Sequence, residues 1–285
     1  MGNILVIESG GSKSDWWYFD EETDEREHIR TKGYHPRWSG SNLTDKILPY
    51  ITNERPKWQP EHIYYYGAGV STDKVRTGIK KELGALYGTS QIKVYDDLIG
   101  AAQALLGQES GLIAILGTGS NSGYYDGEKI AHKVPSLGFL LGDEGSGAYL
   151  GKLIVNEMAY TRDDELRQSF EKWAKKSIDG VVKGIYRSKN PVHWLARYSE
   201  FAAIKRGHDV VDNIIKTNFD LFIEKILMAY ENVGKVNFVG GIAMGYKQEL
   251  LNAMEAHGLE ANQIRRDCGG DLIQYHIKRQ LQEQK

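Results

Sequence analysis

The stretch LIAILGTGSNS, residues 112–122, decides the predicted fold of this chain. Its first five residues form an unbroken apolar run, which predicts a buried strand. The loop that follows is made of Gly, Thr, Ser and Asn. Glycine lets backbone N–H groups approach a phosphate closely, and Thr118, Ser120 and Ser122 add hydroxyl donors. The stretch therefore predicts a strand that ends in an anion-binding loop.

A near copy of this stretch stands at the start of the chain. ILVIESGGSKS, residues 4–14, aligns on residues 112–122 without a gap. Each copy continues into aromatic residues and an acidic turn. The identical positions are Ile7 and Ile115, Gly11 and Gly119, Ser12 and Ser120, and Ser14 and Ser122. We therefore predict that a strand, loop and strand unit is used twice.

Length and pattern predict two α/β domains. The 285 residues exceed the roughly 100–200 of a usual single domain. Helical spacing begins at several places after strand-like runs, including 43–51, and strands followed by helices are typical of α/β folds. We predict an N-terminal domain at 1–107 and a C-terminal domain at 108–285. The second domain carries a predicted helical insertion at about 144–232.

The composition favours small molecules as partners. The formal net charge is -2, so no basic field is available for nucleic acid or an anionic bilayer. No apolar run approaches the roughly 20 residues of a membrane span, and no signal sequence precedes the first strand, so we expect a cytoplasmic protein. The single cysteine, Cys268, excludes a disulfide within the chain and a multi-cysteine metal site built by one subunit.

Two glycine loops suit a nucleoside triphosphate better than a dinucleotide. Gly11-Ser12-Lys13-Ser14 lacks the second glycine of a P-loop and runs into a strand-like segment. The loop from Gly117 fails the dinucleotide fingerprint at its third glycine. Phosphoryl transfer instead needs a phosphate cradle, Mg²⁺, an acceptor pocket and a carboxylate that takes the acceptor proton.

Three acids are candidates for the charged parts of this chemistry. Glu8, at the end of the first strand, suits Mg²⁺ held through water; the alternative is a solvated loop acid. Asp97, between a strand and a helix, is the candidate general base; the alternative is a helix cap. Spacing alone makes Asp96 equally suitable as the base.

Five motifs together resemble the N-acetylglucosamine kinases of the BadF/BadG/BcrA/BcrD ATPase family. They are ESGGSKSD from Glu8, DDLIGAA from Asp96, GTGSN from Gly117, LGFLLGDEGSG from Leu137 and VGGIA from Val239. LGDEGSG is the most specific of them and GTGSN the next. The resemblance covers nearly the whole chain. It implies two duplicated actin-like, ribonuclease H-like ATPase domains with an interdomain cleft.

The resemblance implies a role for individual residues. Asp97 takes the role of catalytic base because Gly100, three residues on, matches the family motif, whereas Asp96 falls where a neutral residue often stands. The implied cofactors are ATP and Mg²⁺, with Glu8 on the metal. The residues implied to bind ATP are Gly10, Gly11, Ser12, Lys13, Gly117, Thr118, Gly119, Ser120, Asn121, Gly240 and Gly241.

The implied acceptor residues contain two departures from the family pattern. They are His35, Asp97, Leu137, Gly138 and Asp143. His35 stands where a sugar-binding Asn is expected, and Leu137 where the glucosamine kinases have an aromatic residue. Asp143 also has a simpler interpretation as a helix cap. A third departure, Ser9 in place of the first glycine of the first loop, keeps a small side chain.

The predicted function is ATP-dependent phosphorylation of the 6-hydroxyl of N-acetylglucosamine or a related amino sugar, by a homodimer. One alternative is an ATPase that activates a partner enzyme by electron transfer, for which Cys268 alone supplies too few cluster ligands. The other is a sugar or ATP sensor without catalysis, against which the presence of Glu8, Asp97 and GTGSN argues.

Overall fold

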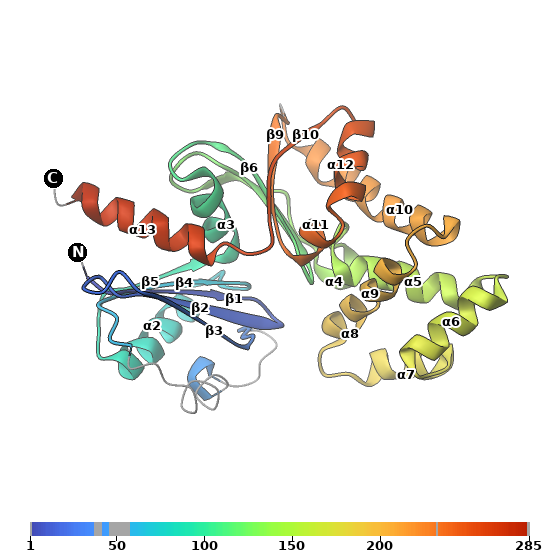
Figure 1. Ribbon diagram of the computed structural model, residues 1–285, viewed down its shortest axis with the longest axis horizontal. Helices are drawn as coiled ribbons and strands as arrows, with labels where there is room; N and C mark the ends of the chain where they lie inside the picture. Colours follow the sequence, from blue (N-terminus) through green and yellow to red (C-terminus); the bar gives the residue numbers. More distant parts are fainter. Residues whose placement is uncertain (1, 37–41, 46–57, 232, 284–285) are drawn as a thin grey trace. The chain divides into compact units, whose positions relative to one another are not determined.

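The computed structural model describes residues 2–36, 42–45, 58–231 and 233–283. Contacts divide the chain into two compact units, coloured along the sequence in Figure 1. Unit 1 comprises Met1–Ser110, Tyr125–Ile130 and Cys268–Lys285, and unit 2 comprises Gly111–Tyr124 and Ala131–Asp267. Most of the helix predicted at 43–51 lies outside the described residues.

Unit 1 is built on a five-stranded sheet with the order β3-β2-β1-β4-β5. β1 pairs antiparallel with β2 and parallel with β4, and β4 pairs parallel with β5. The apolar run of β1 is completely buried, as its unbroken sequence pattern predicts. The strands are β1 Ile4–Ser9, β2 Lys13–Phe19, β3 Arg26–Lys32, β4 His62–Gly67 and β5 Ile92–Asp96.

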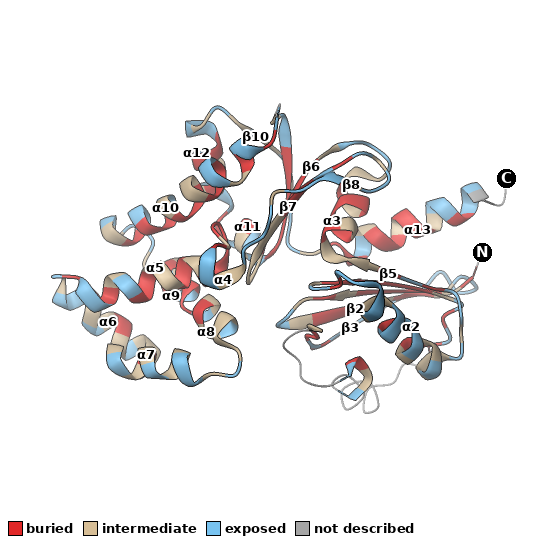
Figure 2. Cartoon of the chain, turned by 180° about the vertical axis from the view of Figure 1, so that it is seen from behind, coloured by how far each residue is buried: buried red, intermediate tan, exposed pale blue. Residues whose placement is uncertain are grey.

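Helices cover both faces of this sheet (Figures 1 and 2). α2, Asp73–Tyr87, packs Ile79 and Leu83 into the core of one face, which also contains Leu5, Ile7 and Tyr65. The other face carries α3, Asp97–Leu106, and α13, Gly269–Glu283. Because strand side chains alternate between faces, Tyr64 and Tyr66 of β4 point away from the α2 core toward α3 and α13.

The segment Cys268–Lys285 packs in unit 1. The prediction groups this segment with the C-terminal domain at 108–285. A Cβ on Gly269 would lie 1.9 Å from the indole nitrogen of Trp17, so α13 starts in close contact with β2. Leu272 and Ile273 of α13 are buried. Sequence order alone places this helix with its neighbours in the chain, which belong to unit 2.

Unit 2 repeats the strand order of unit 1. Its sheet runs β10-β9-β6-β7-β8, so β6 corresponds to β1, and β9 and β10 correspond to β4 and β5. β6 pairs parallel with β9, and β9 with β10. This topology confirms the predicted duplication. The strands are β6 Gly111–Leu116, β7 Ser120–Tyr125, β8 Ile130–His132, β9 Lys235–Val239 and β10 Glu260–Arg265.

A helical segment separates β8 from β9, close to the predicted insertion. Side chains of Ser146, Asp163, Ser177 and Asn190 cap four of its helices. The helices are α4 Gly138–Leu141, α5 Gly147–Tyr160, α6 Asp164–Ala174, α7 Ile178–Arg187, α8 Pro191–Arg197, α9 Ser199–Ile204, α10 Asp209–Lys225 and the 3₁₀ helix η1 Leu227–Ala229. After β9 come α11 Gly241–Gly245 and α12 Lys247–Ala256.

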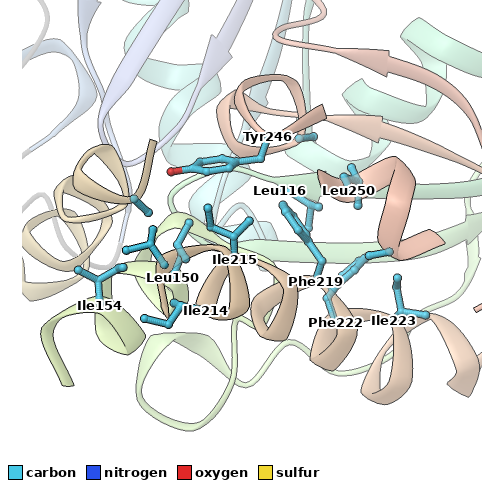
Figure 3. Packing of buried hydrophobic residues seen from close by; sticks show 14 of the residues in the cluster. Leu116, Leu150, Ile154, Ile214, Ile215, Phe219, Phe222, Ile223, Tyr246 and Leu250 are labelled. Atoms are coloured by element: carbon cyan, nitrogen blue, oxygen red, sulfur yellow. The ribbon is translucent and has the colours of Figure 1, made fainter. Parts of the chain in front are cut away.

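The core of unit 2 forms where α10 packs against α5, α12 and β6 (Figure 3). Phe219 and Phe222 of α10 contribute buried rings, and Leu116, Leu150 and Leu250 come from the three neighbouring elements. Leu116 is the last residue of β6, so this core holds the start of the glycine loop in place. In the part of the chain that is described, no helix has the length and apolarity needed to cross a membrane.

Candidate functional site

The carboxyl ends of three strands of unit 1 lie in register at one edge of the sheet. Ser9 of β1 is opposite Gly67 of β4, and Gly67 is opposite Asp96 of β5. Ligands of α/β sheets bind outside this edge. The register therefore brings the first glycine loop and the acidic pair Asp96-Asp97 to the same edge of unit 1.

The first glycine loop is a tight turn of three residues, Gly10–Ser12, between β1 and β2. The Gly10 N–H donates to the Lys13 carbonyl at 2.9 Å, and the Gly33 N–H donates to the Ser12 carbonyl at 3.2 Å. A Cβ on Gly33 would lie 2.2 Å from the Gly10 carbonyl oxygen. A Cβ on Gly11, in contrast, would meet nothing within 4 Å. Gly11 therefore presents open backbone, as a phosphate-binding loop requires.

Ser9 connects this loop to the segment that contains His35. Its hydroxyl lies 2.6 Å from the Ser14 hydroxyl and accepts the Tyr34 N–H at 3.2 Å. The His35 ring lies against Gly69, where a Cβ would be 2.6 Å from the imidazole. The structure thus places a predicted acceptor residue next to a predicted phosphate loop within unit 1. Ser9 replaces the first glycine of the family loop, and its hydroxyl joins β1 to β2 and to Tyr34.

The Glu8 carboxylate accepts the Cys268 N–H at 3.1 and 3.3 Å through its two oxygens. Across the described ranges, no three Asp, Glu, His or Cys side chains gather as a metal-binding group. A Mg²⁺ site at Glu8 would therefore rest on one carboxylate, with water and phosphate oxygens as the other ligands, which is how this ion is often held.

Lys13 pairs with Asp15 at 2.9 Å within β2. Arg30 and His28 of β3 also contact the buried Asp15 carboxylate, at 2.7 and 2.9 Å. Burial by itself raises the pKa of Asp15, but the hydrogen bonds from Arg30, Lys13 and His28 outweigh it and hold this pKa below its ordinary value. Lys13, a predicted phosphate ligand, thus also neutralises an acid of the sheet.

The two adjacent acids at the end of β5 have different tasks. The Asp96 carboxylate accepts the Ile99 N–H at 2.9 Å and is the N-cap of α3. Asp97 is the first helical residue, so the cap interpretation belongs to its neighbour. A Cβ on Gly100 would lie 2.8 Å from the Tyr66 ring, so glycine lets α3 approach β4. This contact holds the helix that starts with Asp97.

The second glycine loop, Gly117–Gly119 between β6 and β7, is held by the start of α5. The Gly147 N–H donates to the Gly117 carbonyl at 2.8 Å, and the Ala148 N–H donates to the Thr118 carbonyl at 3.0 Å. The Gly117 N–H donates to the Gly119 carbonyl at 3.0 Å. All three loop carbonyls are therefore bonded within the protein, which fixes the path of the loop backbone.

Gly240 fixes the other side of this loop. Its φ is 130°, and a Cβ there would lie 2.2 Å from the Leu116 carbonyl oxygen and 3.1 Å from the Gly117 nitrogen. No other residue fits such a position without strain. Gly240 and the second loop, which the resemblance assigns to different parts of ATP, are in contact within unit 2.

Asp143 lies against the second loop. Its φ is 65°, and a Cβ on Gly119 would lie 2.9 Å from its carboxylate. Burial, with a smaller contribution from the charge of Glu144, raises the pKa of Asp143 to about 6, although the Ser120 N–H bonds its carboxylate. Ser146, which accepts the Tyr149 N–H at 3.1 Å, is the cap of α5. The helix-cap interpretation of Asp143 is therefore wrong.

A cavity of about 320 Å³ opens beside this loop in unit 2. Its wall contains Ser120, Asn121, Leu137 and Asp143, all of which were predicted as site residues from sequence. The remaining lining residues are Ser122, Val134, Pro135, Ser136, Leu141, Gly142, Glu144, Phe222, Lys225 and Ile226. The structure thus brings predicted phosphate-binding and acceptor-binding residues of unit 2 to one cavity.

The sequence does not reveal the ion pair in this wall. Lys225 contacts the buried Glu144 carboxylate at 2.9 Å. The hydrogen bond and charge of Glu144 raise the pKa of Lys225. Glu144 belongs to the LGDEGSG motif, but Lys225 ends a helix eighty-one positions later in the chain. Only the packing of α10 beside α5 joins them.

Comparisons with known proteins identify the fold. No protein-family model matches the chain, and a search of curated protein sequences returns no match. Among solved structures, a Porphyromonas gingivalis protein assigned as an N-acetylglucosamine kinase is 29% identical, with a TM-score of 0.86. The match covers 96% of this chain and 98% of that one.

Two further structures are more distant. A Chromobacterium violaceum protein, also assigned as an N-acetylglucosamine kinase, has a TM-score of 0.73 at 14% identity, over 96% of this chain and 99% of that one. A ROK family glucokinase from Streptomyces griseus, solved with glucose and AMPPNP, has a TM-score of 0.62 at 16% identity, over 95% and 96%. At such identities these two matches establish the actin-like ATPase fold alone.

Proposed function

We propose that this chain, an N-acetylglucosamine kinase-like protein with the actin-like ATPase fold, transfers a phosphoryl group from ATP to the 6-hydroxyl of an amino sugar. The likeness to the Porphyromonas gingivalis protein over nearly the whole of both chains supports kinase chemistry. The observation that carries the proposal is the separation of tasks between Asp96, which caps α3, and Asp97, which heads that helix at the ligand-binding edge of the sheet.

Asp97 would accept the proton of the acceptor hydroxyl as the phosphorus–oxygen bond forms. A carboxylate suits this role because the proton leaves late in phosphoryl transfer and the base mainly positions the hydroxyl. The loops at Gly10–Ser12 and Gly117–Asn121 would bind phosphate oxygens, and Gly240-Gly241 would contact the adenosine side. ATP supplies the transferred group, and Glu8 would hold Mg²⁺ through water.

The unit 2 cavity supports an acceptor with an apolar substituent. Leu137 and Leu141, both in its wall, have 61% and 77% of their surface exposed. Exposed leucine beside a cavity is stabilised when a ligand methyl group covers it. An N-acetyl group supplies such a methyl, and Asp143 can accept a sugar hydroxyl at neutral pH. We therefore favour an N-acetylated sugar over a free amino sugar or glucose.

The test is a coupled assay of ADP release with the full chain. N-acetylglucosamine, N-acetylmannosamine, N-acetylmuramic acid, glucosamine and glucose are compared at equal concentration with a sugar-free blank. We expect ADP above the blank with at least one N-acetylated sugar, and a higher kcat/KM than with glucosamine. ADP release at the blank rate with every sugar would contradict the kinase proposal.

The activator ATPase gains no support from the structure. Its electron transfer would need exposed thiolates to hold a cluster, whereas the single cysteine, Cys268, is 1% exposed in unit 1.

A further inference from the structure

A second, smaller cavity lies in unit 1, on the face of β4 and β5 that α3 and α13 cover. Tyr64 and Lys93 are neighbours across the two strands, and Tyr66 and Tyr95 are neighbours two residues further on. Tyr275, His276, Arg279 and Gln280 line the same cavity from one side of α13, and Gln103 lines it from α3. None of these residues belongs to the kinase site described above.

Most polar groups around this cavity satisfy one another. The His276 ring stacks on Tyr64 with centroids 3.4 Å apart, and its Nε2 lies 2.6 Å from the Tyr66 hydroxyl. The Tyr66 hydroxyl donates to Gln103 Oε1 at 2.7 Å. Since Tyr66 has one proton, His276 Nε2–H must donate to it. Burial, followed by the charges of Lys93 and Arg279, lowers the pKa of His276 to about 3, so the ring is neutral at pH 7.

Gln280 is the exception. The residue is 8% exposed, and neither its Nε2 nor its Oε1 has a hydrogen-bond partner. A buried amide without partners costs free energy, so an oxygen atom beside it, from water or from a ligand, would stabilise the fold. The cavity beside it has a volume of about 20 Å³. That volume accepts one water or one oxygen atom of a larger ligand.

The charges around this cavity favour an anion. Lys93 and Arg279 are both exposed, and the lining contains no carboxylate. Lys93 Nζ lies 5.9 Å from the centroid of the Tyr64 ring, and Arg279 Nη1 donates to the Tyr275 hydroxyl at 3.2 Å. Both cations line the cavity together with His276. A ligand oxygen in the cavity would therefore lie within reach of two positive charges.

We propose that Gln280, Lys93 and Arg279 form a binding site for a monoprotonated phosphate group. A single protonated phosphate oxygen would enter the cavity, where it would accept from Gln280 Nε2 and donate its proton to Gln280 Oε1. The remaining oxygens stay at the surface beside Lys93 and Arg279, which bind phosphate strongly. Sulfate has no proton at neutral pH and leaves Oε1 without a partner. The site stands independently of the kinase proposal.

The experiment follows the side-chain amide signals of Gln280 by ¹⁵N NMR, with the signals assigned by their loss in Gln280→Leu. Inorganic phosphate, glycerol 3-phosphate and sulfate are titrated separately at constant ionic strength. We expect saturable shifts with a phosphate compound and at least about tenfold weaker binding of sulfate. The tighter of the two phosphate compounds identifies a free ion or a monoester as the ligand. This measurement needs no turnover, so it stands whether or not the chain is a kinase.

The double variant Lys93→Gln/Arg279→Gln should weaken phosphate binding at Gln280 at least about tenfold. Lys80→Gln, which removes an exposed lysine of α2 in the same unit, is the matched control and should leave the titration unchanged. Equal melting temperatures would show that the double variant folds. If phosphate did not shift the Gln280 signals, the proposed phosphate site would be wrong, and water alone would occupy the cavity. Equal affinities for sulfate and phosphate would overturn the role given to the P–OH group.

Discussion

The turn between β1 and β2 and the turn between β6 and β7 arise from the same strand order but are held differently. In unit 1 the turn is held by Ser9, Ser14 and the segment at Gly33-Tyr34. In unit 2 the first N–H groups of α5 hold the carbonyls of Gly117 and Thr118. One turn therefore depends on hydroxyl groups and the other on a helix N-terminus.

This difference shows what duplication preserves. The strand order and the glycine turn recur, because β6 and β7 must pair next to each other as β1 and β2 do. The supports differ because different chain segments follow each copy. After β3 come Gly33 and Tyr34, which bond the first turn, whereas after the equivalent β8 comes a helical segment that brings α5 to the second turn. A substitution that destabilises one glycine turn should therefore leave the contacts of the other turn unchanged.

The largest effect on activity is expected at the end of β5, whose residues differ from those at the end of the equivalent strand β10. β5 ends at Asp96-Asp97, whereas the corresponding β10 ends at Arg265-Arg266. Asp97→Asn removes the only proposed proton acceptor of the pair and should lower kcat by about 10²- to 10⁴-fold. ATP binding, measured by calorimetry, should stay within about twofold of the wild type.

Asp96→Asn is the matched control for this prediction. It weakens the cap of α3 and should cost about 1 kcal/mol of stability or less, with kcat largely kept. If Asp97→Asn turned over at the wild-type rate, or if only Asp96→Asn lost activity, the assignment of the base would be wrong.

Steric substitutions test each turn separately. Gly240→Ala would place a methyl group 2.2 Å from the Leu116 carbonyl oxygen, and Gly33→Ala would place one 2.2 Å from the Gly10 carbonyl oxygen. Both backbones must move, so we expect a loss of about 3 kcal/mol in each variant. Hydrogen exchange should show faster opening of the β6–β7 turn in the first variant and of the β1–β2 turn in the second.

Gly241→Ala and Gly11→Ala are the controls, because a Cβ at either position meets nothing within 4 Å. Both should keep the wild-type melting temperature within a few degrees. A Gly240→Ala variant as stable as Gly241→Ala would contradict the close approach described for the second turn.

The smallest expected effect is a change of stability with pH. The direction of this change differs between Asp143 in unit 2 and Asp15 in unit 1. The pKa of Asp143 in the folded protein is about 6, above its ordinary value of 3.8. Its contribution to stability is therefore full below pH 4 and is lost as the pH rises through 6. Relative to wild type, Asp143→Asn should gain on the order of 1–2 kcal/mol between pH 4 and pH 7.

The contribution of Asp15 to stability changes with pH in the opposite direction, because the pKa of Asp15 in the folded protein is below 3.8. Its contribution is full above pH 4 and is lost as the pH falls below that value. Asp15→Asn should therefore be less stable than wild type at pH 7, and the difference should shrink in acid. Melting curves of the two variants and wild type from pH 3 to pH 7.5 measure both trends. Parallel profiles for wild type and Asp143→Asn would refute the raised pKa.

Sequence patterns predicted the strands with unbroken apolar runs and missed the polar strand β10. β1 and β6 each contain an unbroken apolar run that is mostly buried, so their pattern is unambiguous. β10, with the sequence EANQIR, alternates partly buried and exposed residues and resembles a loop. It forms a strand because it pairs parallel with the edge of β9. Tertiary pairing, and not the local pattern, therefore determines that these residues are extended.

The sequence located the acidic pair at the end of β5, but it could not divide the structural tasks between the two residues. The sequence presented Asp96 and Asp97 as equal candidates, and only the direction of the Ile99 N–H assigns the cap to Asp96. It allowed Asp143 to be a cap, whereas the φ of 65° turns its carboxylate to the second loop. These outcomes depend on backbone angles that residue type alone does not determine.

The sequence by itself determined the duplicated strand and loop unit, the α/β class and the positions of the glycine turns. These features depend on local pattern and on the small size of glycine, which a single chain segment carries. The tertiary structure alone decided the packing of α13 in unit 1, the pairing of Lys225 with Glu144 and the unpartnered amide of Gln280. The packing of α13 and the Lys225–Glu144 pair join residues far apart in the chain, and the burial of Gln280 follows from that packing of α13. Such contacts exist only after the core has packed.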